Sequence, residues 1–292
     1  MAAEQKFSHF VGIDWSGAKG KRHKGLAVAL CRVGDSAPKL VLPPSGHANW
    51  SRAEIAGWIK TGCGLGAEAR VLVGIDSAFS MPFLDKGAYL GVTHGLSHVK
   101  MLWDAVESAC SHDVDLYGGA FAVSYKRHYH MPGARGADYE RRMRVAETRA
   151  VEAGAGPCES VFHLIGPSQV GLSGLSTIRM LVRLSGTPGL AIWPYDRLEG
   201  AQIVLTEIYA ANFAAMGGHR GQIRDIQALN RALKTLGSKP FRRRNDSLSD
   251  DDCDAVITAA GLRTVTGSRN YWHPPALSTM VRETEGWIFG IL

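Results

Sequence analysis

Val11-Gly12-Ile13-Asp14 and Val73-Gly74-Ile75-Asp76 repeat the same four residues, and these two segments decide the fold. Each closes a short apolar run, which begins at Phe10 in the first copy and at Val71 in the second. Short runs rich in β-branched residues are typical of buried strands. Each strand therefore delivers a carboxylate near its carboxyl end, where a buried charge requires a partner or a cation.

The pattern around these segments predicts an α/β fold with a mixed five-stranded sheet, flanking helices and a helical insertion. Ser51 is typical of a helix N-cap, and its helix separates the first three strands from the fourth. We expect strands at 10–14, 26–32, 39–42, 70–76, 191–195 and 202–210, and later helices at 97–110, 137–153, 171–184, 222–236 and 250–262. One domain is expected over residues 8–292, with a mostly helical insertion at about 80–190.

Three further acids extend the pattern of carboxylates. Glu207 lies in the apolar segment 203–209, and Asp251 and Asp254 begin a late helix. Asp251 and Asp254 are three residues apart, so they share one helical face. Carboxylates that converge from neighbouring elements provide the hard oxygen ligands that Mg²⁺ and Mn²⁺ prefer.

Each acid also has a purely structural interpretation. Asp14 and Asp76 follow strands, where an Asp commonly begins a turn. Asp250 and Asp252 are expected to complement the amino-terminal end of their helix. The metal interpretation is favoured for the others because several acids occur in positions that can converge.

The composition is that of an ordinary globular protein. The chain has 292 residues, of which 45% are hydrophobic and 21% charged. The chain contains no run of 18 apolar residues, so no membrane span is expected. Its first residues are polar, so no secretory signal is expected either. Five scattered cysteines form no Cys-x-x-Cys pair, so free thiols and a cytoplasmic location are expected.

Positive charge is clustered along the chain, which carries a net charge of +6. The clusters are Lys19, Lys21, Arg22, His23 and Lys24; Lys126, Arg127, His128 and His130; Arg141, Arg142, Arg144 and Arg149; and Arg242, Arg243 and Arg244. Such clusters suit phosphate backbones, although any one of them could equally be a solvated face. Beside an acidic site, four clusters favour a nucleic acid as partner.

This order of strands, with acids on the first strand, the fourth strand and the last long helix, resembles the ribonuclease H-like fold. Residues 251–255 resemble the Asp-x-x-Asp-Ala segment of RuvC-type resolvases. The nearer resemblance is to an uncharacterised family of predicted RNase H-like nucleases. It rests on segments similar to Val11 to Asp14, Gly74 to Ser77, Thr206 to Tyr209, Asp251 to Ala255 and Glu285 to Ile288, which span nearly the whole chain.

The resemblance implies hydrolysis of nucleic-acid phosphodiester bonds with Mg²⁺ or Mn²⁺. It carries over Asp14, Asp76, Asp251 and Asp254 as metal ligands, and Glu207 as a catalytic acid or a purely structural one. Resolvases often have Glu at the fourth strand, whereas this chain has Asp76, whose shorter side chain would shift the position of the site. Two cations about 4 Å apart can activate water and stabilise the leaving oxygen, and Asp14 is expected to bridge them.

Two other functions remain open. Asp14-Trp15-Ser16-Gly17 loosely resembles the first phosphate loop of actin-like proteins, which would imply an ATP-dependent phosphotransferase. Those enzymes use two such domains around the nucleotide, and this chain looks short for that arrangement. A non-catalytic nucleic-acid-binding protein could also keep the same fold.

Overall fold

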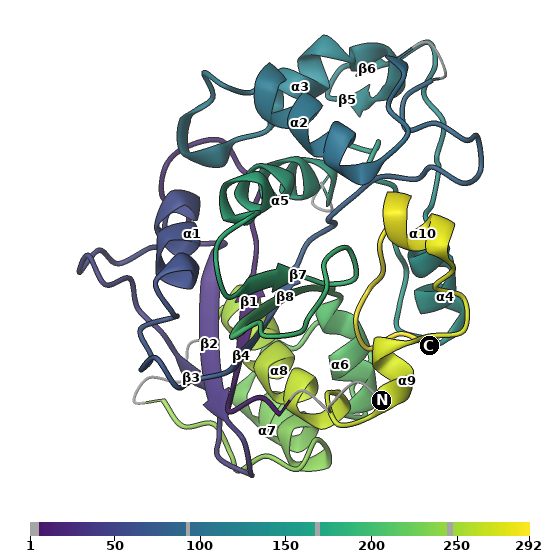
Figure 1. The fold of residues 1–292 in the computed structure, drawn as a ribbon. Coiled ribbons are helices and arrows are strands. Elements are labelled where there is room, and N and C mark those ends of the chain that lie inside the picture. Colours follow the sequence, from purple (N-terminus) through teal and green to yellow (C-terminus); the bar gives the residue numbers. More distant parts are fainter. Residues whose placement is uncertain (1–5, 92–93, 167–169, 244–247) are drawn as a thin grey trace.

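The computed structural model describes residues 6–91, 94–166, 170–243 and 248–292, and a mixed sheet lies at its centre (Figure 1). The strands are β1 (His9–Asp14), β2 (Ala27–Arg32), β3 (Lys39–Leu40), β4 (Val71–Asp76), β7 (Leu190–Ile192) and β8 (Ile203–Ile208), in the order β3-β2-β1-β4-β8-β7. The α/β class is therefore confirmed. The predicted five-stranded sheet is wrong in its count, because all six segments expected as strands join one sheet, with β7, expected at 191–195, as a parallel strand at the edge beside β8.

The two Val-Gly-Ile-Asp segments are neighbours in this sheet. β1 and β4 are parallel, and their register pairs Gly12 with Gly74 and Asp14 with Asp76. Side chains at paired positions point to the same face of a sheet. The sequence repeat thus becomes a structural one, with two carboxylates beside each other at the carboxyl edge.

Both faces of the sheet are covered by helices. Ile13 and Ile75 point into a core shared with α1 (Arg52–Lys60) and α5 (Val170–Leu184). Phe10 and Leu72 point into a second core, shared with α6 (Ala210–Met216), α7 (Ile226–Thr235) and α8 (Asp250–Val265). Alternating positions of each strand therefore face different cores, and Asp14 and Asp76 share the face of α8.

Helix α8 packs unusually close to the sheet. A Cβ atom on Gly12 would lie 2.2 Å from the carbonyl oxygen of Ala255, and one on Gly74 would lie 2.9 Å from Leu262. Because Gly12 contacts residues 255–259 and Asp14 lies beyond it, the amino-terminal turn of α8 covers the carboxyl edge of β1. The glycines in the repeat therefore set the distance between sheet and helix.

The regular elements between β4 and β7 are mainly helices, and this segment lies largely at the top of Figure 1. Apart from α5, it contains α2 (Val99–Ala109), α3 (Gly119–Ser124), α4 (Val145–Glu152), two 3₁₀ turns (Val114–Leu116 and Lys126–His128) and the hairpin of β5 (His130–Met131) and β6 (Ala134–Arg135). The expected exposed helix at 137–153 is shorter than predicted, since only α4 is helical. The preceding segment is fixed in another conformation by Arg142, which donates to the carbonyl oxygens of Pro82 and Ala88.

The end of the chain returns to the sheet after α9 (Arg269–Trp272) and α10 (Thr279–Thr284). The amide of Phe289 donates to the carbonyl oxygen of Glu207, and Trp287 is fully buried. The five cysteines are free, as expected. None of the helices in the described ranges has the length and apolar character needed to cross a membrane.

Replacing Gly12 with Ala tests the contact between α8 and the sheet. The added methyl group would meet backbone atoms of α8, so we expect the variant to lose at least about 1–3 kcal/mol of unfolding free energy, the usual cost of overpacking. Urea denaturation measures this difference. The matched control is Gly57→Ala in α1, where nothing lies within 4 Å and Ala should stabilise by about 0.5–1 kcal/mol. Equal effects of the two substitutions would contradict the close packing.

Candidate metal centre

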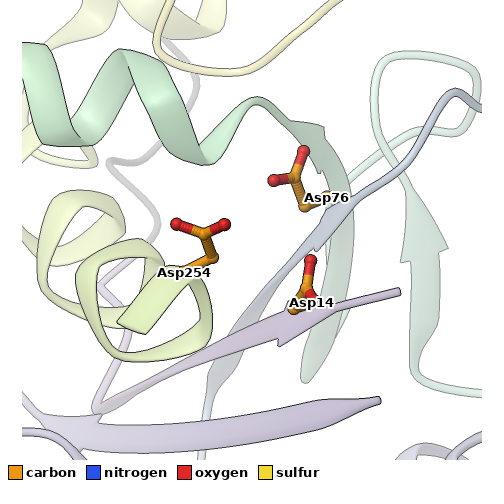
Figure 2. Close-up of side chains that lie close together, drawn as sticks. All are labelled: Asp14, Asp76 and Asp254. Atoms are coloured by element: carbon orange, nitrogen blue, oxygen red, sulfur yellow. The ribbon is translucent and has the colours of Figure 1, made fainter. Parts of the chain in front are cut away.

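Three aspartates from three elements converge at the carboxyl edge of the sheet. Asp14 ends β1, Asp76 ends β4 and Asp254 lies in the second turn of α8. Each offers one carboxylate oxygen to a group whose members all lie within 4.8 Å of one another. Figure 2 shows the three side chains directed toward a common point between the two strands and the helix.

The packing of α8 explains how Asp254 reaches the strands. Ala255 and Thr258 lie over Gly12, and one helical turn earlier come Asp251 and Asp254. Because α8 and β1 run in opposite directions, that earlier turn lies over the end of β1. Asp251 is beside the group and shares a side-chain hydrogen bond with Asp14, but it is outside the set of three mutually close carboxylates.

Burial and mutual repulsion disfavour the charged forms of these carboxyls. Burial raises the pKa of Asp14 well above its ordinary value, and the charges of Asp76, Asp254 and Asp251 raise it further. Burial, followed by the charge of Asp254, raises the pKa of Asp76 to about 8, although a backbone hydrogen bond from Ala210 acts in the opposite direction. Burial and the nearby acids raise the pKa of Asp254 to about 7. The group lacks a positive charge at its centre.

No such charge comes from the protein in the described ranges. None of the ion pairs there includes Asp14, Asp76 or Asp254. The amide of Ala210 donates to Asp76 over 3.2 Å, which leaves most of the carboxylate lone pairs free for another ligand. Several converging carboxylates without a cationic side chain fit a hard divalent cation such as Mg²⁺ or Mn²⁺.

The other two acids at the start of α8, Asp250 and Asp252, lie in its first turn and contact arginines. The Ser249 hydroxyl caps the helix by accepting from the amide of Asp252 over 3.0 Å. The side chain of Asp252 is 2.6 Å from Arg243, and Asp250 is 3.6 Å from Arg224. Asp250 and Asp252 thus occupy the first-turn positions expected for acids that complement the helix dipole.

Glu207 lies apart from the three aspartates. It is paired with Ile75 in the β4–β8 register, one residue away from the pairing of Asp76, so its side chain points to the opposite face of the sheet. There it forms a buried ion pair with Arg144 and accepts a hydrogen bond from the amide of Phe79 over 2.9 Å. This surrounding is that of a structural acid.

Sequence reasoning missed the role of Arg144, which was grouped with Arg142 as a phosphate-binding cluster. Both side chains are buried: Arg142 pairs with Asp85, and Arg144 binds Glu207 and Glu147. The spacing of Arg144 and Glu147, three residues apart at a helix start, was the available signal. Arg142 and Arg144 therefore pair with acids inside the protein and are not available to bind phosphate.

Arg52 is a second missed residue, and it fixes the loop after Asp14. Its fully buried guanidinium donates to the carbonyl oxygens of Ser16, Ala18 and Gly20 over 2.8–3.0 Å. Asp115 lies 3.8 Å from it and also caps α1. An Arg near the start of an amphipathic helix gives no sequence signal for such a role.

Comparisons of this chain with protein-family models, curated proteins and solved structures found no match. The resemblance to RNase H-like nucleases consequently stays a prediction. What the site can do has to follow from its own carboxylates.

The raised pKa values predict how stability depends on pH without metal. Between about pH 4 and pH 8 the folded protein keeps protons that the unfolded chain has released, so its free energy of unfolding falls as the pH rises. Asp14→Asn removes one of the repelling charges. In EDTA at pH 8 we expect this variant to be more stable than the wild type by at least about 1.4 kcal/mol, the equivalent of one pKa unit.

Thermal and urea unfolding at pH 4 and pH 8 measure the difference, which should nearly vanish at pH 4. Mn²⁺ should stabilise the wild type more at pH 8 than at pH 5 because it competes with protons, and it should stabilise Asp14→Asn much less. Asp104→Asn, on the exposed face of α2, serves as the control. A destabilised Asp14→Asn protein at pH 8 would refute the electrostatic account.

Glu207→Gln separates a structural acid from a metal ligand. The substitution breaks a buried ion pair, so we expect a loss of about 3–5 kcal/mol in unfolding free energy. Mn²⁺ affinity, measured by calorimetry below the unfolding temperature, should change less than threefold. A variant of normal stability that no longer binds Mn²⁺ would instead place Glu207 in the metal centre.

Proposed function

We propose that this protein is a nuclease of the RNase H-like type, which hydrolyses phosphodiester bonds with Mg²⁺ or Mn²⁺ held by Asp14, Asp76 and Asp254. The observation that carries the proposal is the convergence of these carboxylates within 4.8 Å without a cationic partner in the described part of the chain. Asp251, which is hydrogen-bonded to Asp14, completes the set of ligands.

The topology supports the RNase H-like assignment. Strands β3, β2 and β1 form antiparallel pairs with one another, and β4 and β8 follow after crossovers and are parallel to β1. The acids lie on the first strand, the fourth strand and the last long helix, as the resemblance implies. In this interpretation β7 is an addition at the edge of a five-stranded core.

The residues divide the work by position. Asp14 is central, since it is paired with Asp76 in the sheet and hydrogen-bonded to Asp251, so it is the best candidate to bridge two ions. Bound divalent ions would lower the pKa of a water nucleophile and stabilise the leaving oxygen. The buried setting of Asp14 and Asp76 limits solvent access and would strengthen the attraction between their carboxylates and a bound cation.

The loop after Asp14 brings positive charge to the rim of the centre. Lys19, Lys21 and Lys24 are exposed on this loop. The buried Arg52 fixes the loop backbone by donating to its carbonyl oxygens. Phosphate groups are attracted by such lysines, whereas the bare carboxylates repel them. The loop can therefore hold the phosphate backbone while the aspartates hold the metal.

The structure favours this function over the two alternatives. The described part of the chain has one large sheet and one small hairpin, whereas an actin-like phosphotransferase would need two large domains. A protein that only binds nucleic acid has no use for buried carboxylates that repel phosphate. Those carboxylates reduce stability unless a cation binds, which favours a site kept for metal-dependent chemistry.

A cleavage panel tests the proposal. Labelled single-stranded, duplex, hybrid and junction substrates would be incubated with Mg²⁺, Mn²⁺ or EDTA. We expect cleavage that requires the metal and that falls at least about 100-fold in Asp14→Asn and in Asp254→Asn, more than altering a group that only orients a ligand usually costs. Asp104→Asn, with an exposed carboxylate, is the matched control.

The outcomes separate the candidate functions. No cleavage of any substrate, together with no Mn²⁺ binding by calorimetry, would refute the metal centre. Metal binding and ATP turnover without cleavage would favour the phosphotransferase. Cleavage that persists in both variants would show that a contaminant or another site is responsible.

A further inference from the structure

A large groove lies beside β3, the edge strand at one side of the sheet in Figure 1. It has a volume of about 1240 Å³, above the range of about 300–1000 Å³ that is usual for small-molecule sites. Its lining includes residues 36–43, residues 239–243 and the beginning of β2. This size fits an extended ligand better than a compact one.

The groove is rich in positive charge. Five basic residues line it, namely Lys24, Lys39, Lys239, Arg242 and Arg243, and the lining contains a single acid, Asp252. All five are exposed. Two of them form exposed ion pairs, Lys239 with Asp35 and Arg243 with Asp252, whereas Arg142 and Arg144 are buried in theirs. The first basic cluster of the sequence supplies Lys24 to the groove, and the last supplies Arg242 and Arg243, while its Arg244 lies outside the described residues.

Part of the groove lining lies next to the three aspartates in the fold, although none of the three lines the groove itself. Ala27, which lines the groove, is paired with Asp14 in the β1–β2 register. Ser249 and Asp252 also line it and lie in the same helical turn as Asp251. A chain lying in the groove would therefore pass beside the elements that carry the carboxylates.

The lining also offers apolar side chains to the ligand. Leu42 is 75% exposed, and Leu40 and Leu248 are half-buried. A single strand has apolar base faces beside an anionic backbone, and both match a groove with apolar walls and a cationic rim. A duplex keeps its base faces stacked inside and presents mainly phosphates.

From this match we infer that single-stranded nucleic acid is the substrate class and that it reaches the metal centre along this groove. The inference rests on the proposed nuclease function. It assigns Lys39 and Arg242 to phosphate binding, at positions outside the carboxylate centre.

Binding without hydrolysis tests the inference. A fluorescein-labelled 20-nucleotide single strand and its duplex would be titrated with the protein in EDTA and followed by anisotropy. We expect the single strand to bind more tightly than the duplex, and Lys39→Glu/Arg242→Glu to weaken this binding at least tenfold. Losing two phosphate contacts should also reduce the salt-dependence slope by about 1.4, at about 0.7 per contact on a single strand.

The control is Lys60→Glu/Lys234→Glu, which makes the same charge change at exposed positions of α1 and α7, away from the groove lining. Circular dichroism would verify that both double variants are folded. Photocrosslinking of a bromouridine-substituted strand to the wild type gives a second measurement, and crosslinks in residues 36–43 or 239–243 are expected.

The results separate this inference from the proposed function. Equal effects of the two double variants, absent binding, tighter binding of the duplex, or crosslinks only elsewhere would overturn the groove, even if metal-dependent cleavage is found. Groove-dependent binding of the single strand without any cleavage would support the groove as a binding site and refute the hydrolytic function.

Discussion

The contact of α8 with Gly12 and Gly74 is the constraint on which the rest of the structure depends. At Gly12 the helix backbone reaches the strand, since a Cβ atom there would lie 2.2 Å from a carbonyl oxygen of the helix, and at Gly74 the space is filled by the side chains of Leu262 and Ile208. Asp254 is carried on the same helix, one turn before the contact, so its distance from Asp14 is set by the glycines. The packing of α8 against the sheet and the spacing of the three carboxylates therefore depend on the same contact.

That geometry has an energetic consequence. Three carboxylates held together in a buried place oppose their own ionisation, and the pKa of Asp76 rises to about 8 as a result. Folding must supply the free energy that keeps them there, and it comes from the two cores on either side of the sheet. A bound cation would offset part of this unfavourable free energy, because a ligand that binds only the folded state stabilises that state.

How far the sequence could be interpreted depended on whether the signal was local. The strands and the positions of Asp14 and Asp76 follow from apolar runs and from the parallel pairing of two identical segments. The face on which Glu207 lies could not be predicted, because strands buried on both sides are apolar throughout and show no alternation. The same holds for Arg144 and Arg52, whose partners are distant in sequence and are brought near only by the fold.

The two kinds of charge in this molecule are separated in space, and the separation gives a reason for their order of action. Basic side chains such as Lys39 and Arg242 line an exposed groove, while the aspartates lie apart from that lining, at the carboxyl edge of the sheet under α8. The groove would attract a phosphodiester chain at any metal concentration, but the bare carboxylates would repel it. Only when cations neutralise the aspartates can the scissile phosphate approach them, so the proposed activity requires the metal for the last step of binding as well as for hydrolysis.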